Sequence, residues 1–295
     1  MKKIIILLAS LTLLSCLILA GCADSNSGAS ERQFDSNSQE NVVSREEGSG
    51  TRQAFIELLG IELKSDNGTK VDQTTKEAVI ANKTDVMLTT VAGDKYSIGY
   101  VSMGSLNDTV KALSVDGVEA TAANVKNGTY KLARTFNIAI KGETSGLAED
   151  FINFILSAEG QQVVADNYIP ISDDASAYIS KKPSGKIVVA GSSSVTPVME
   201  DLREAYLAIN PDVIIEVQQS DSTAGMNAVI DGMADIGMAS RELKESESAQ
   251  LTSIPIALDG IAIIVNTANP MTNITAEQAR GIFTGEITVW NEVIK

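Results

Sequence analysis

The chain has 295 residues, 44% hydrophobic and 21% charged, enough to bury the core of one two-lobed domain or of two domains. Lys and Arg total 23 against 38 Asp and Glu, a net charge of −15, and aromatic residues make up only 4%. These values argue against a nucleic-acid partner, although local dipoles can still hold a small anion. The absence of histidine removes Ser-His-Asp and Cys-His catalysis and most zinc sites.

After Met1 come two lysines and an apolar run, 4–20, whose end forms the sequence Leu-Ala-Gly-Cys at 19–22. This order resembles a bacterial lipoprotein signal peptide, residues 1–21, with Cys22 lipidated as the first mature residue. A plain transmembrane anchor is the alternative, but the run is short for a span. Cleavage would remove Cys16 and leave no free thiol, with 21 basic residues against 38 acidic ones, a balance of −17.

Residues 22–40 are rich in Ser and Asn and predict a flexible tether, whereas strand and helix patterns alternate from Asn41 onward. The expected strands are 40–44, 96–103, 136–141, 186–191, 213–219, 235–240 and 254–266. The expected helices are 52–59, 75–82, 148–166, 222–234 and 275–287, with a further helix within 192–210 that stops at Asn210-Pro211. Residues 172–185 form a polar joint between two such groups. The alternation predicts an α/β fold with parallel sheets.

Three strand ends lead into turns rich in Gly and hydroxyl residues, and each turn opens a helix: 48–51, 191–194 and 220–223. A helix N-terminus presents unpaired N–H groups and a partial positive charge, and small residues allow a ligand to come close. Three converging turns would suit a tetrahedral oxyanion, to which Arg45 could add a planar fork. Taken singly, each turn is more typical of an ordinary N-cap than of a ligand site.

Several segments carry a family resemblance: "VVSREEGSGTRQAF", "VVAGSSSVTPVMEDL", "ADIGMASRELK", "IPIALDGIAIIVNTANP" and "ARGIFTGEITVWNEV". They resemble the phosphate-binding lipoproteins of Pst-type ABC importers over nearly all of 41–295. The resemblance implies a two-lobed type II periplasmic-binding-protein-like fold, with a helix-flanked sheet in each lobe and crossover strands between the lobes. The implied lobes are 41–133 with 259–295, carrying the Gly-Ser-Gly-Thr turn, and 134–258, carrying the Gly-Ser-Ser-Ser turn.

The order of these segments differs from the family, whose members begin with the segment that here starts near 186. The chain therefore resembles a circular permutant in which 172–185 joins the old ends, since surface loops tolerate such cuts. A truncated or fused reading frame is the alternative.

The resemblance also implies which residues bind phosphate. The set is Arg45, Ser49, Gly50, Thr51, Ser193, Ser194, Ser222 and Arg241. Many relatives have an acidic residue where Arg241 stands, to accept the proton of the phosphate. Arg241 either adds positive charge to the site or forms an outward ion pair with Glu242 or Glu245.

The resulting hypothesis is an extracytoplasmic, lipid-anchored protein at the cell membrane. It captures inorganic phosphate between its two lobes and delivers it to the permease of an ABC transporter. It would be a monomer and not an enzyme, with no cofactor, no metal and no nucleic-acid partner. The alternatives are a phosphatase-like enzyme and a non-transport oxyanion sensor or adhesin on the same fold.

Overall fold

The computed structural model describes residues 33–65, 70–144 and 146–294, and Asp35–Lys295 form one compact unit. The predicted signal peptide 1–21, the lipidation residue Cys22 and the first part of the predicted tether lie outside the described residues. Within the described part of the chain, no helix is both long and apolar enough to cross a membrane.

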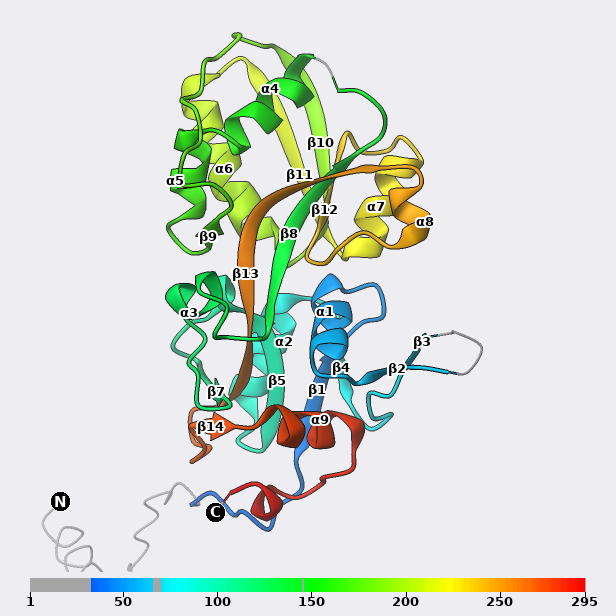
Figure 1. Cartoon of the computed structure of the whole chain (residues 1–295), viewed down its shortest axis with the longest axis vertical. Helices are drawn as coiled ribbons and strands as arrows, with labels where there is room; N and C mark the ends of the chain where they lie inside the picture. The colour runs from blue at the N-terminus through cyan, green and yellow to red at the C-terminus, as the bar shows by residue number, and fades with distance from the viewer. Residues whose placement is uncertain (1–32, 66–69, 145, 295) are drawn as a thin grey trace, which may run out of the picture. The chain divides into compact units, whose positions relative to one another are not determined.

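A ten-stranded mixed sheet runs the length of this unit, in the order β11-β10-β12-β8-β13-β5-β1-β4, with β6 and β9 added beside β13 (Figure 1). Its strands are β1 (Asn41–Arg45), β4 (Val79–Ala81), β5 (Ser97–Ser102), β6 (Val110–Ala112), β8 (Ala133–Ile140), β9 (Ile169–Pro170), β10 (Gly185–Ser192), β11 (Val213–Ser220), β12 (Ile236–Ala239) and β13 (Thr252–Asn266). Two small pairs lie apart from it: β2 (Glu62–Lys64) with β3 (Lys70–Asp72), and β7 (Ser114–Val115) with β14 (Asn273–Ile274).

Strand β13 is shared between the two halves of this sheet. Its residues up to Gly260 pair antiparallel with β8, and its residues from Ile261 onward pair antiparallel with β5. The strands on either side are parallel: β10 with β11 and β12, and β1 with β4 and β5. The predicted parallel pairing therefore holds within each half, while the two central strands are antiparallel.

Helices pack on both halves. We call β1, β4, β5 and β6 with α1 (Gly50–Leu58), α2 (Thr84–Gly93), α3 (Ala122–Lys126) and α9 (Ala276–Thr284) the Gly-turn lobe. We call β10, β11 and β12 with α4 (Gly146–Ile155), α5 (Ala158–Val164), α6 (Thr196–Ile209), α7 (Ser222–Ile230) and α8 (Glu245–Ser248) the Ser-turn lobe. Single 3-10 turns lie at Met103–Ser105 and Trp290–Glu292. Strands β8 and β13 continue from one lobe to the other (Figure 1).

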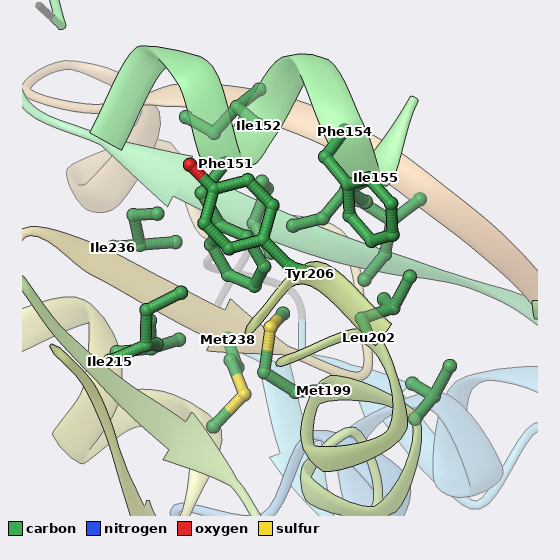
Figure 2. Close-up of a cluster of buried hydrophobic side chains, with 14 of the residues drawn as sticks. Phe151, Ile152, Phe154, Ile155, Met199, Leu202, Tyr206, Ile215, Ile236 and Met238 are labelled. Carbon is green, nitrogen blue, oxygen red and sulfur yellow. The ribbon is translucent and has the colours of Figure 1, made fainter. Parts of the chain in front are cut away.

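Each lobe has its own apolar core, which fixes the helix ends relative to the sheet. In the Ser-turn lobe, Phe151 and Phe154 of α4 meet Tyr206 of α6 above Ile236 and Met238 of the sheet (Figure 2). In the Gly-turn lobe, the rings of Phe55 and Tyr100 stack with centroids 3.9 Å apart, and Phe283 meets both rings edge-on or nearly so.

One predicted helix is wrong, and another is divided into two helices. Residues 75–82 contain β4, a parallel edge strand beside β1, and the helix of this region begins at Thr84. The β-branched Val79 and Ile80 suit such an edge. The predicted helix 148–166 is two helices: α4 ends at Ile155, and Ser157 caps α5 by accepting a hydrogen bond from the Gly160 N–H.

The first and last residues of the fold lie together. Gln39 forms a β-bridge with Val289, and the Glu40 N–H donates to the Thr288 carbonyl at 3.0 Å. The Trp290 N–H donates to the Ser38 carbonyl at 3.2 Å. The last part of the predicted tether is therefore attached to the fold before Asn41.

Candidate functional site

The three Gly- and hydroxyl-rich turns each link a strand to the helix that follows it: β1 to α1, β10 to α6 and β11 to α7. The first turn lies in the Gly-turn lobe and the other two lie in the Ser-turn lobe. The structure brings them together, and most of their hydroxyl side chains are buried, whereas Ser220, Asp221 and Thr223 are half-buried. The buried polar residues at this meeting point are Arg45, Ser49, Thr51, Thr84, Ser192, Ser193, Ser194, Ser222, Ser240 and Arg241.

Hydroxyl groups from the two lobes meet directly. Thr51 Oγ1 of α1 lies 2.8 Å from Ser194 Oγ. Thr84 Oγ1, at the start of α2, lies 3.3 Å from Ser193 Oγ and 3.4 Å from Ser194 Oγ. A hydroxyl both donates and accepts, so the same groups can turn their hydrogens toward an anion.

Arg45, the last residue of β1, places its guanidinium beside this hydroxyl cluster. Its Nη2 donates to Ser193 Oγ at 3.0 Å, and its Nε donates to the Ala81 carbonyl at 3.1 Å. The carboxylate of Glu46 takes two further bonds from Nε and Nη2, at 2.9 and 2.7 Å. Arg45 is only 2% exposed, so its charge acts from within the protein.

The Gly-Ser-Gly-Thr turn begins α1. Ser49 is its N-cap, and its hydroxyl oxygen accepts a hydrogen bond from the Arg52 N–H at 3.3 Å. This capping bond uses a lone pair, so the hydroxyl hydrogen is still available to a ligand. Gly50 lies close against the other lobe: a Cβ there would stand 2.4 Å from Ser222 Oγ and 2.7 Å from Ser240 Oγ.

Ser222 and Ser240 belong to a second group of hydroxyls in the Ser-turn lobe. The Ser240 N–H donates to Ser222 Oγ at 3.2 Å, and Ser192 Oγ donates to Ser240 Oγ at 2.9 Å. Asp221, rather than Ser222 or Thr223, is the N-cap of α7, since its carboxylate accepts from the Ala224 N–H at 2.8 Å. The Ser222 hydroxyl therefore does not cap its own helix, and it lies beside Gly50 of the opposite lobe.

Arg241 is buried, and its charge is paired within its own lobe. Its Nη1 and Nη2 donate to the two carboxylate oxygens of Glu247 at 2.7 and 2.8 Å. This partner is neither Glu242 nor Glu245, and the pair is buried rather than outward. Burial acts to raise the pKa of Glu247, but the bonds from Arg241 and the Lys244 N–H outweigh it and hold the pKa below its ordinary value.

A third buried ion pair joins the two crossover strands beside the site. Arg134 of β8 donates through Nε and Nη2 to Asp259 of β13, at 3.1 and 3.0 Å, and Ser102 Oγ donates to the same carboxylate at 2.8 Å. Arg134 Nη1 also donates to the Ser240 carbonyl at 3.0 Å. Through this bond, Arg134 links the crossover strands to Ser240, one of the buried residues of the site.

Sequence reasoning missed Thr84 and Ser240. Thr84 follows β4 and opens α2, so it is a fourth strand–turn–helix position, which the wrong helix at 75–82 concealed. Ser240 directly precedes Arg241, and only the position of the strand end at Ala239 could have indicated it.

The arrangement suits non-covalent capture of a small oxyanion. Hydroxyls, helix N-termini and the buried Arg45 all supply donors, while the nearby carboxylate of Glu46 is paired with Arg45 itself and that of Glu247 with Arg241. Over the described ranges, no three His, Cys, Asp or Glu side chains are grouped so that they could hold a metal ion.

Comparison with known proteins agrees with this architecture. The family model described as the PBP superfamily domain matches residues 26–159 and 176–295. The phosphate-binding protein PstS 2 of Streptococcus agalactiae serotype V is 51% identical over 99% of each chain. The protein of the same name from Streptococcus pneumoniae serotype 4 is 46% identical over 91% of this chain and 92% of its own.

A solved structure is similar over most of the fold. The crystal structure of a phosphate-binding protein of a phosphate ABC transporter from Streptococcus pneumoniae TIGR4 superimposes with a TM-score of 0.70. It is 46% identical and covers 87% of this chain and all of its own. The chain therefore belongs to the PBP superfamily and, within it, to the family of PstS phosphate-binding proteins.

Proposed function

We propose that this chain captures inorganic phosphate between its two lobes and presents it to the permease of an ABC importer. The observation that carries the proposal is the meeting of Thr51 in one lobe with Ser194 in the other, beside the buried Arg45. Because both lobes contribute hydrogen-bonding groups to the site, a bound anion favours the closed state. The names of the similar proteins support phosphate as the anion.

We assign the phosphate contacts to the buried groups at this meeting point. In the Gly-turn lobe these are Arg45, the Ser49 hydroxyl, and the N–H groups of Gly50 and Thr51 with the Thr51 hydroxyl. In the Ser-turn lobe they are Ser193, Ser194 and Ser222. Thr84 joins the set because of its contacts with Ser193 and Ser194. Arg241 contributes through its place in the wall, since its two terminal nitrogens are engaged by Glu247.

We further propose that the chain order is a circular permutation of the family pattern. The bridge between Gln39 and Val289 supports this, because the two ends of the fold are adjacent and a cut between them leaves every sheet pairing in place. The Streptococcus agalactiae relative has the same order of segments, since it aligns with 99% of this chain. The joint 172–185 then connects the old ends.

Attachment to the extracytoplasmic face of the membrane through lipid on Cys22 completes the proposal. It is supported by the basic, apolar and Leu-Ala-Gly-Cys segments of the first 22 residues. A receptor role is favoured over a phosphatase-like role because the sequence offers no histidine base.

Titration calorimetry of the purified protein with phosphate, sulfate and a phosphonate tests the proposal, with light scattering on the same sample. We expect one phosphate per monomer and no turnover of a phosphoester. Absence of anion binding would favour a sensor or adhesin, and phosphoester hydrolysis would favour the enzyme. Binding only as an exchanged dimer would contradict the permuted single-chain receptor.

A further inference from the structure

Besides the hydroxyl cluster, a backbone carbonyl of one lobe contacts a helix of the other. The Gly48 carbonyl, in the loop between β1 and α1, accepts from the Thr223 N–H at 3.2 Å and from Thr223 Oγ1 at 3.3 Å. The two residues are 175 positions apart in the chain. These bonds therefore connect the Gly-turn lobe to the Ser-turn lobe without passing through the proposed phosphate contacts.

The contact completes the N-terminus of α7. The first N–H groups of a helix have no partner inside it, and Asp221 already caps Ala224. Thr223 is the second residue of α7, and its N–H is satisfied by the carbonyl of the opposite lobe. This cap exists only while the lobes are together, because separation returns both groups to water.

The hydroxyl of Thr223 is held in place from its other side. Arg241 Nη2 donates to it at 3.2 Å, and Lys244 Nζ donates at 3.4 Å. A threonine hydroxyl has one hydrogen and two lone pairs, so it can accept both bonds while donating to Gly48. The buried pair with Glu247 fixes Arg241 in turn, so the hydroxyl has one favoured direction.

Only glycine lets the loop come this close. A Cβ at position 48 would stand 2.3 Å from Oδ1 of Asp221, far inside contact distance. The backbone of the Gly-turn lobe thus lies directly against the first turn of α7.

We infer that Thr223, oriented by Arg241, is a positioning residue that holds the lobes closed and sets how long bound phosphate stays. The inference about phosphate rests on the proposed function, whereas the inference about closure does not. A bond made only after closure slows opening and leaves the encounter with the anion unchanged. This gives Arg241 a role in closure rather than in accepting the phosphate proton.

Phosphate release from the full chain, followed by stopped flow, tests the inference. In Thr223→Val we expect release to be about three- to tenfold faster, the effect of one lost hydrogen bond, with an unchanged association rate. Thr223→Ser keeps the hydroxyl and should restore slow release. Thr90→Val is the matched control, since the Thr90 hydroxyl donates to the Val86 carbonyl within its own helix.

A double variant tests the part assigned to Arg241. Arg241→Met with Glu247→Met replaces the buried pair by apolar side chains and leaves no unpaired charge. We expect faster release in this background, and adding Thr223→Val should then have little further effect, because both changes act on one hydroxyl. Full additivity would contradict the role of Arg241.

Hydrogen exchange of segments 46–51 and 221–226 without any added anion separates closure from phosphate binding. Faster exchange in both segments of Thr223→Val supports the closing contact, even if the parent protein binds no phosphate and the proposed function fails. Exchange and release equal to those of Thr90→Val and the parent would overturn the inference.

Discussion

Thr51 and Ser194 face each other across the two lobes with their hydroxyl oxygens 2.8 Å apart, although 143 residues separate them in the chain. Each stands at the start of a helix that follows a sheet strand. A ligand held by both would join the lobes through two helix N-termini at once. The predictions below follow from this site and from the buried groups around it.

Ser49→Ala and Arg45→Ala should each weaken phosphate binding by about 1.5–3 kcal/mol, the value of one hydrogen bond to a charged ligand. Calorimetry measures the change. Arg280→Ala is a suitable control, because Arg280 of α9 is a partly exposed arginine paired with Glu286, which follows that helix. Unchanged binding in both site variants would place the phosphate elsewhere.

Gly50→Ala should weaken phosphate binding without lowering the thermal stability of the fold. The added methyl group would press on Ser222 and Ser240 of the other lobe, so phosphate binding should be lost or strongly weakened. The thermal midpoint should stay the same or rise, because alanine favours helix over glycine. Gly93→Ala, on α2 with open space around it, should bind phosphate like the parent. Normal binding by Gly50→Ala would show that the lobes need not approach so closely.

Glu40→Gln should remove a pH dependence of stability. Burial, together with the charge of Glu292, raises the pKa of Glu40 to about 7 in the folded protein, above its ordinary value. The folded state therefore prefers the protonated form. This stabilisation is complete below the ordinary pKa and is lost as the pH rises through about 7, a change of roughly 2–4 kcal/mol.

Urea unfolding between pH 5 and pH 9 measures this effect. The parent should lose stability from pH 5 to about pH 7 and level off above it, and Glu40→Gln should be the more stable protein at pH 9. The exposed Glu77 provides the control substitution, Glu77→Gln. Parallel curves for the parent and Glu40→Gln would refute the assignment.

Asp259→Ala should destabilise the fold by about 3–5 kcal/mol, because it leaves the guanidinium of Arg134 buried without its charged partner. Replacing both residues, as Arg134→Met with Asp259→Leu, should cost less than the single change. Denaturant unfolding measures both. If Asp259→Ala were as stable as the parent, water would have to solvate Arg134 in place of the Asp259 carboxylate.

Cys22→Ser should abolish lipid labelling and release the protein from membranes, since a single lipid-bearing residue is the proposed attachment. Fractionation of cells expressing each form is the measurement. Retention of the variant in the membrane fraction would point to an uncleaved apolar segment.

The sequence predicted the strand ends of the site well because their signals are local. Buried strands followed by Gly and Ser can be recognised without knowing what they pack against, as at Val189 and Ser194. The prediction of a helix at 75–82 was wrong because the structure of this segment depends on a partner distant in the sequence. Residues 79–81 form a strand by adding to the edge of β1, and that pairing concealed Thr84.

Arg241 shows a second limit of sequence reasoning. Its neighbours in the chain, Glu242 and Glu245, are the obvious partners, but the first turn of α8 brings Glu247 to it instead. An ion pair is chosen by geometry in three dimensions, and in this stretch the acidic residues are too similar for spacing to decide.

The contacts between residues 38–40 and 288–290 determine what tryptophan fluorescence can report in this protein. Trp290 is the only tryptophan in the chain and is fully buried there, with its indole N–H donating to the Tyr96 carbonyl at 3.2 Å. We therefore expect its emission to follow the integrity of the junction between residues 38–40 and 288–290, and to change little when the lobes open or close around the anion. Chain ends and binding site thus have separate spectroscopic signatures, and a fluorophore placed near Thr51 or Ser194 can be read against an internal reference.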